Sequence, residues 1–167
     1  MASTQSTTRR GNWGPIILGA GVVVIYLLAT RSPGLPEGWG DNYAAAQQQA
    51  TADHKKMLVA FSMDGCPPCR MMERSVLPVE AVKQALAGYV PVHVDAVKHS
   101  DLAERMGIVG TPTYVVAASD GTPLLSASGY LPVDSFVEFL KEGAKAEKPA
   151  QGDSPTFRGA DSAPTKD

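Results

Sequence analysis

The sequence predicts an α/β domain built as a three-layer sandwich, with a mixed central sheet between helices and an N-terminal transmembrane helix ahead of it. Three observations predict this class. Helical and strand-like patterns alternate over residues 41–145, the dipeptide Asp120-Gly121 separates two strand-like runs, and an uncharged apolar block occupies residues 16–29. Strands joined through a helix run parallel and strands joined by a tight turn run antiparallel, so the sheet is mixed.

The apolar block predicts a membrane anchor over residues 13–30. Its centre reads IILGAGVVVIYLLA, and with its flanks it reaches roughly the 17 residues that a spanning helix needs. Arg9 and Arg10 precede it, which favours a cytoplasmic N-terminus at 1–12 and a domain on the extracytoplasmic, periplasmic side. A cleaved signal peptide is the alternative, although the residues after Leu28 make a poor cleavage site.

Proline and glycine mark residues 31–40 as a linker, and the periodic elements begin at residue 41. Asp41 is expected to cap a first helix. The continuous apolar run at 57–63 indicates a strand covered on both faces. A helix should follow, interrupted by Pro78 and resumed at 79–87.

The later elements follow from strand alternation, turn residues and helical spacing. They are a strand at 89–95, a short helix capped by Ser100 or Asp101 and stopped by Gly107, strands at 113–118 and 124–128, and a helix that Pro132 opens and Gly143 closes. The domain then ends near residue 145. Residues 146–167 are rich in Pro, Gly, Ser and Ala, so we expect a disordered tail.

The chain has two cysteines, Cys66 and Cys69, separated by Pro67 and Pro68. Their place between a buried strand and a helix puts both sulfurs on the first helical turn. Exposed N–H groups and the positive helix end stabilise a thiolate on Cys66, the form that attacks disulfides, and Cys69 can then resolve the mixed disulfide. A loop this short constrains the unfolded chain little, so chemistry explains the pair better than stability.

Other uses of the pair fit less well. A zinc site needs two more ligands, and the three histidines, which we interpret as surface or satisfied residues, lie elsewhere at His54, His93 and His99. Covalent haem attachment needs histidine where Arg70 stands. An inert buried pair conflicts with the exposure expected at a helix start. We therefore expect no metal and no cofactor, and the net charge of −2 gives no reason to expect nucleic acid.

The sequence resembles the thioredoxin superfamily, and more closely its secreted or membrane-tethered members than small cytosolic thioredoxin. The matching segments are MLVAFSMDGCPPCRMMERSVL, YVPVHVD, MGIVGTPTYVV, the Asp-Gly hairpin and Gly129. The resemblance implies a thioredoxin-like fold over about 41–143, thiol–disulfide oxidoreductase activity and a cis peptide at Thr111-Pro112. It also implies that Gly65, Pro67, Thr111 and Pro112 contact the substrate.

Two departures from the family pattern bear on activity. Gly65 stands where the family often has tryptophan, which removes part of a substrate-contact surface. Ala60 stands where many thioredoxins bury an aspartate. Proton transfer at Cys69 is then left to water or to an unidentified group.

The two prolines favour a reductase. Neither Pro67 nor Pro68 has an N–H, so among the nearest donors only the Cys69 amide and later ones can reach a Cys66 thiolate, and Asp64 opposes it. A reductant outside the cytoplasm needs a transmembrane thiol electron donor. Family analogy suggests disulfide-bonded protein substrates such as apocytochrome c or misoxidised envelope proteins. A tethered binding module, or a copper or zinc carrier without redox turnover, remains the alternative.

Overall fold

The computed structural model describes residues 36–147, so the predicted N-terminus 1–12, the anchor 13–30, the first half of the linker and the tail from 148 lie outside the described residues. The elements in chain order are α2 (Tyr43–Ala52), β1 (Lys56–Ser62), α3 (Pro67–Ser75), α4 (Glu80–Leu86), β2 (Tyr89–Asp95), α5 (Ser100–Arg105), β3 (Thr113–Ala117), β4 (Pro123–Ser128) and α6 (Val133–Lys145). Among these residues, no helix has the length and apolar character needed to cross a bilayer.

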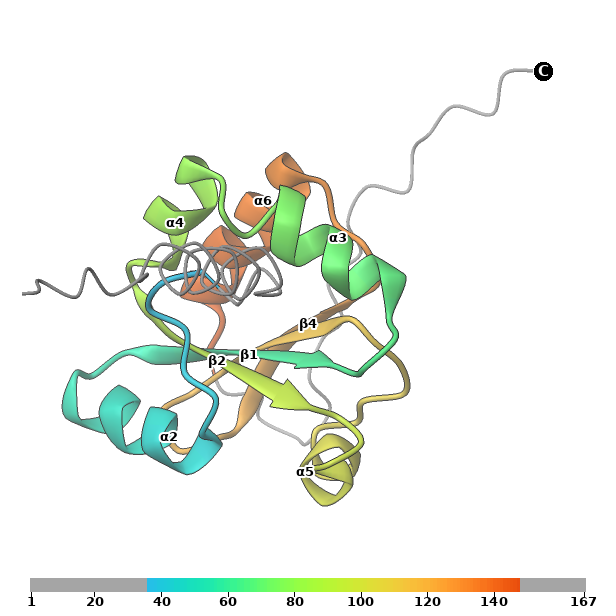
Figure 1. The fold of residues 1–167 in the computed structure, drawn as a ribbon. Helices are drawn as coiled ribbons and strands as arrows, with labels where there is room; N and C mark the ends of the chain where they lie inside the picture. Colours follow the sequence, from blue (N-terminus) through green and yellow to red (C-terminus); the bar gives the residue numbers. More distant parts are fainter. Residues whose placement is uncertain (1–35, 148–167) are drawn as a thin grey trace, which may run out of the picture. The chain divides into compact units, whose positions relative to one another are not determined.

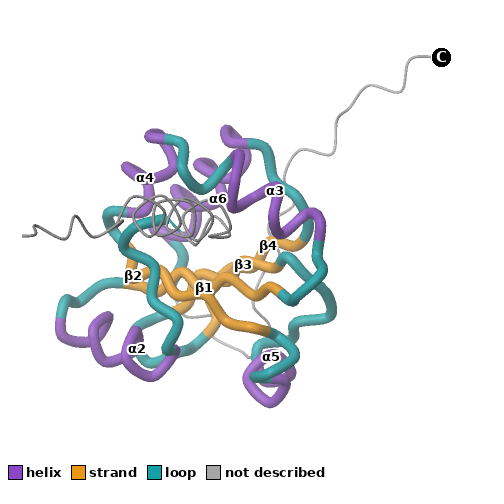
Figure 2. The backbone as a smooth tube through the Cα atoms, viewed as in Figure 1, coloured by secondary structure: helices purple, strands orange, loops and turns teal. Residues whose placement is uncertain are grey.

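The four strands form one mixed sheet in the order β2-β1-β3-β4. β1 pairs in parallel with β2, because α3 and α4 carry the chain back across the sheet, and it pairs antiparallel with β3. The hairpin at Asp120-Gly121 joins β3 to β4 in antiparallel register. β1 is therefore the inner strand that leads to the cysteines (Figure 2).

Helices cover both faces of this sheet (Figure 1). One core packs α3, α4 and α6 against the sheet, and the other packs α2 and α5 against the opposite face. Side chains of β1 alternate between the cores: Leu58 and Ala60 enter the first, while Met57, Val59 and Phe61 enter the second. The predicted three-layer arrangement with a strand buried on both faces is confirmed.

The sequence predicts that the last helix ends at Gly143, but α6 continues to Lys145. Gly143 lies buried inside it, and a Cβ there would be 2.6 Å from Cγ2 of Val116, so glycine permits close packing of α6 on β3. The helix ends where Nζ of Lys56 donates hydrogen bonds to the carbonyls of Gly143, Ala144 and Ala146, at 3.0, 2.7 and 2.6 Å. This cation satisfies carbonyls that a helix end leaves without partners.

Two helix caps also differ from expectation. α2 is capped by Asn42 rather than Asp41, because Oδ1 of Asn42 accepts the N–H of Ala45 at 3.0 Å. α5 has His99 at its cap position, with no side-chain cap hydrogen bond, in place of Ser100 or Asp101.

The second half of the predicted linker belongs to the ordered domain. Trp39 packs against the first core, and Gly40 forms a parallel bridge with Val92 of β2. Two backbone hydrogen bonds make this bridge: Gly40 donates to Pro91 at 3.1 Å and His93 donates to Gly40 at 2.8 Å. The ordered chain therefore starts before residue 41.

Candidate active site

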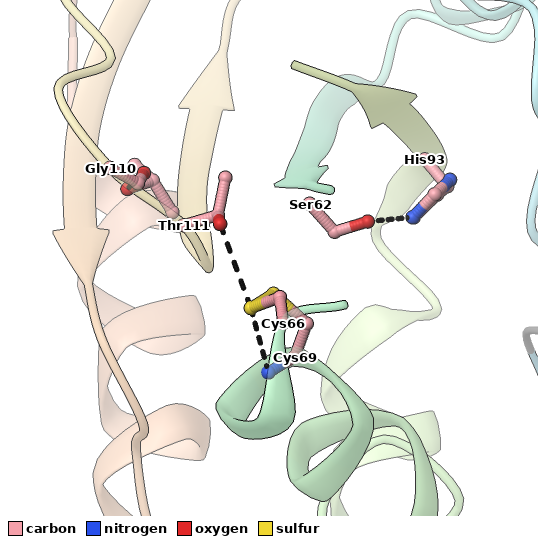
Figure 3. The surroundings of a disulfide bond; sticks show 7 residues. Ser62, Cys66, Cys69, His93, Gly110 and Thr111 are labelled. Atoms are coloured by element: carbon pink, nitrogen blue, oxygen red, sulfur yellow. Dashed lines mark hydrogen bonds between the residues drawn. A yellow bond between two sulfur atoms is a disulfide. The ribbon is translucent and has the colours of Figure 1, made fainter. Parts of the chain in front are cut away.

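Cys66 and Cys69 are joined by a disulfide at the start of α3. Cys66 occupies the N-cap position and Pro67 and Pro68 open the helix. The N–H of Cys69 donates to Sγ of Cys66 at 3.3 Å (Figure 3). The first amide available to the Cys66 sulfur is therefore that of Cys69, as the two prolines predict.

The cysteines are more covered than the sequence analysis expected. The exposed fraction is 7% for Cys66 and 4% for Cys69, so the expectation of an exposed pair is wrong for most of their surface. Thr111 explains part of this cover, because its hydroxyl lies 3.6 Å from Sγ of Cys66. Cys69 is one helical turn further along α3 and is slightly less exposed than Cys66.

The loop before β3 lies directly beside the disulfide (Figure 3). Its Thr111-Pro112 bond is cis, as the resemblance implied. Oγ1 of Thr113 donates to the carbonyl of Gly110 at 2.8 Å and shares a 2.9 Å hydrogen bond with Ser128, which ties the loop to β4. This loop is thereby held in place next to Cys66.

Of the four predicted substrate-contact residues, Gly65 and Pro67 flank Cys66 in the sequence, and Thr111, followed by Pro112, lies beside it in space. Gly65 and Pro67 are exposed on either side of Cys66, and Gly65 has a φ of +77°, a conformation that glycine adopts freely. Thr111 is half-buried and Pro112 is buried behind it. The disulfide is therefore bordered by the exposed Gly65 and Pro67 and by the loop that carries Thr111.

An apolar rim that no sequence motif indicates borders this loop. Met63, Val97 and Val109 have exposed fractions of 46%, 67% and 98%. All three line a groove of about 330 Å³ that reaches Thr111. Exposed apolar side chains that gather at one site mark an interaction surface. Their sequence signal was weak, because the three residues lie on separate loops.

A second feature that no sequence motif indicates is the pair formed by Ser62 and His93 in the surroundings of the disulfide. Oγ of Ser62 lies 2.5 Å from Nε2 of His93, and both side chains are half-buried (Figure 3). The pKa of His93 is lowered, chiefly by burial, and the positive charge of Lys98 lowers it further. The carboxylates of Glu73, Asp95 and Asp41 act in the opposite direction and raise it. The alternation of YVPVHVD could have placed His93 on the face covered by α3, together with Tyr89.

No group of three or more His, Cys, Asp or Glu side chains suited to holding a metal ion occurs within residues 36–147.

The sequence model of the thioredoxin-like domain family matches residues 43–144. The chain belongs to this family. Thiol:disulfide interchange protein DsbD of Vibrio cholerae is 23% identical over 158 residues, which are 79% of this chain and 26% of that protein. The chain thus spans about a quarter of that curated relative.

Two solved structures extend the comparison. The oxidised C-terminal domain of Neisseria meningitidis DsbD is 25% identical, with a TM-score of 0.54, over 63% of this chain and 98% of that domain. A thioredoxin from Thermus thermophilus is 28% identical, with a TM-score of 0.56, over 62% of this chain and 84% of that protein. With its Cys66–Cys69 disulfide, this thioredoxin-like domain is a thiol–disulfide oxidoreductase.

Proposed function

We propose that this protein reduces disulfides of other proteins outside the cytoplasm, with Cys66 as nucleophile and Cys69 as resolving thiol. The observation that carries the proposal is the Cys66–Cys69 disulfide at the N-terminus of α3, beside the Thr111 loop. That position gives the sulfur at the helix cap both an attacking role and access to a partner.

The reaction transfers two electrons to the client. The Cys66 thiolate attacks one client sulfur, a bond forms between them, and the second client sulfur leaves as a thiolate. Cys69 loses its proton and attacks Sγ of Cys66, which forms the disulfide seen here and releases the first client sulfur. The oxidised domain then needs two electrons from a donor before it can act again.

The surroundings of Cys66 favour reduction over oxidation. A strong oxidant of this fold stabilises its thiolate, and potentials run from about −270 mV for thioredoxin to about −120 mV for DsbA. Here the nearest donors are the Cys69 amide at 3.3 Å and the Thr111 hydroxyl at 3.6 Å, and Pro67 and Pro68 contribute none. We place the potential near the reducing end of that range.

The client is a polypeptide that lies along the threonine loop. Backbone groups at Thr111 can pair with an extended segment next to its cystine, with Pro112, Gly65 and Pro67 completing the contact. The rim of Met63, Val97 and Val109 supplies apolar surface for neighbouring side chains. Gly65 leaves room for a bulky group where the family often carries tryptophan.

The location rests on the segment at 13–30 and on the relatives named thiol:disulfide interchange protein. We infer an anchor there, with residues 1–12 on the cytoplasmic side and the domain on the periplasmic side. A transmembrane thiol protein would supply the electrons, and apocytochrome c or misoxidised envelope proteins would receive them.

Insulin reduction by the full chain, with dithiothreitol as the electron source, tests the activity. Wild type should accelerate precipitation of the insulin B chain, and Cys66→Ser should abolish the acceleration. Cys69→Ser should accumulate a mixed disulfide with insulin that non-reducing electrophoresis detects. A wild type no faster than dithiothreitol alone, or a Cys66→Ser variant that keeps its rate, contradicts the proposal.

A further inference from the structure

We propose that His93, held by Ser62, accepts the proton that Cys69 loses in the resolving step. This inference rests on the proposed function. His93 would act as the proton acceptor in place of the aspartate that many thioredoxins bury where this chain has Ala60.

The resolving step needs a proton acceptor inside the domain. A thiol attacks only after ionisation, and the thiol of a free cysteine has a pKa of about 8.5 that burial in apolar surroundings raises. Cys69 lies in the first turn of α3 with an exposed fraction of 4%, so bulk water has little direct access to it. Ala60, on the strand below, carries no group that can take the proton.

The strand register brings His93 to that place. Ala60 of β1 is the register partner of His93 on parallel β2, and Ser62 lies two residues beyond Ala60 on the same face of β1. Ala60 packs in the core that includes Met72 of α3, three residues from Cys69. Ser62 and His93 therefore lie on the side of the sheet that α3 covers, next to the disulfide (Figure 3).

The 2.5 Å contact with Ser62 fixes the imidazole. A serine hydroxyl can donate to a neutral ring nitrogen and accept from a protonated one, so the contact survives when the ring gains a proton. An orienting partner of this kind is what positions a histidine base in other sites.

The charges around His93 suit a base that works near neutral pH. Burial favours the neutral ring, which is the form that can accept a proton, and Lys98 acts in the same direction. Glu73 of α3, Asp95 of β2 and Asp41 ahead of α2 favour the imidazolium once it forms. The ring is therefore neutral before the step and supported by three carboxylates after it.

The proton balance is complete within the proposed cycle. The S–H bond of Cys69 breaks, and its proton ends in a new N–H bond on the His93 ring. The sulfur keeps the electron pair and attacks Sγ of Cys66. When the electron donor later reopens the disulfide, Cys69 leaves as a thiolate and takes a proton back from the imidazolium.

Stopped-flow kinetics of the reduced full chain with a disulfide-bonded peptide separates the two steps. We expect His93→Gln to slow release of the second peptide thiol at pH 7 by about tenfold or more, the low end of what a positioned base contributes. Formation of the mixed disulfide should stay within about twofold of wild type, since Cys66 makes that attack. Ser62→Ala should slow the second step less, and His54→Asn, a histidine at a positive φ that asparagine tolerates, should change neither step.

The pH profile distinguishes a base from a structural residue. In wild type the second step should rise through an inflection below pH 6.5, and His93→Gln should lack that inflection. NMR titration of the His93 ring in wild type should give the same inflection pH, which tests the assignment even if the variant fails to fold. A second step with equal rate and profile in His93→Gln, or a ring that titrates more than one pH unit from the kinetic inflection, overturns the inference. A wild type that reduces no peptide contradicts the proposed function instead.

Discussion

At the scale of single residues, the chemistry of the site depends on which backbone amides face the Cys66 sulfur. The side chain of an N-cap residue accepts from the second or third residue of its helix. The second residue of α3 is Pro68, which has no N–H, and the third is Cys69, which donates at 3.3 Å. One of the two usual donors is therefore missing.

Pro68→Ala should restore that donor and make the protein more oxidising. A hydrogen bond to a charged group contributes about 1.5–3 kcal/mol, which lowers the pKa of Cys66 by roughly one to two units and raises the potential by about 30–60 mV. Equilibration with glutathione buffers measures the potential, and thiolate absorbance measures the pKa. Pro67→Ala is the matched control, because the first helical N–H does not reach the cap side chain, and an equal shift in both variants would sink the explanation.

His93 should also make stability depend on pH. Its pKa in the folded protein is lowered by burial, so the unfolded chain binds the proton more readily. The stability linked to His93 is present above its unfolded pKa of about 6.5 and is lost as the pH falls through its folded value. Urea unfolding at pH 7.5 and pH 5 should show a decrease in the free energy of unfolding that His93→Gln reduces. A decrease of equal size in His93→Gln would assign it to other groups.

The sequence identified some of these residues and not others, for a physical reason. Cys66 and Cys69 could be found because their chemistry depends on local spacing within one helical turn. Ser62 and His93 lie 31 residues apart and meet only through the pairing of β1 with β2. No sequence motif links a serine in one strand to a histidine in another, so the pair cannot be recognised until the strand register is known.

At the scale of elements, strands were easier to predict than helix ends. The expected strand at 89–95 coincides with β2, because alternation repeats over its whole length. Helix ends depend on single contacts instead, as the Asn42 cap shows. Gly143 is the sharpest case, since glycine usually marks the residue after a helix, and here it lies inside one to allow contact with β3.

Gly143→Ala should destabilise the domain, although alanine is the better helix former by about 1 kcal/mol. The added methyl would meet Val116 at 2.6 Å and the Tyr89 hydroxyl at 3.1 Å, and overpacking of a core costs about 1–3 kcal/mol. Thermal unfolding should show a lower Tm than wild type. Ala144→Gly, at the exposed neighbouring position, should lose only the helix-propensity difference of about 1 kcal/mol, and a Gly143→Ala variant that gains stability would disprove the close contact.

At the scale of the whole molecule, the predicted three-layer architecture held because the order of elements left few alternatives. A helical crossover gave the parallel pair, and the Asp-Gly turn gave the antiparallel one. The start of the ordered domain was harder to place. The composition of 31–40 indicates a linker, yet Trp39 and Gly40 join the core and the sheet through partners distant in sequence.

The domain boundary can be tested with two truncated chains. A chain of residues 36–147 should unfold cooperatively, and one of residues 41–147 should unfold at a lower temperature. The shorter chain loses the packing of Trp39 and the two backbone hydrogen bonds of Gly40. Circular dichroism melts compare them, and a Trp39→Ala variant of the longer chain separates the two losses. Equal melting temperatures in both chains would show that residues 36–40 do not stabilise the domain and belong to the linker.

The Lys56 contacts have a practical consequence. Lys56 begins β1, and the far end of that strand, about 20 Å away at roughly 3.3 Å per strand residue, leads to Cys66. The described chain leaves the domain at this remote end. A fluorophore or bead coupled just after residue 147 would therefore start away from the groove at Thr111, and single-molecule studies of client capture could use that handle without obstructing the thiols.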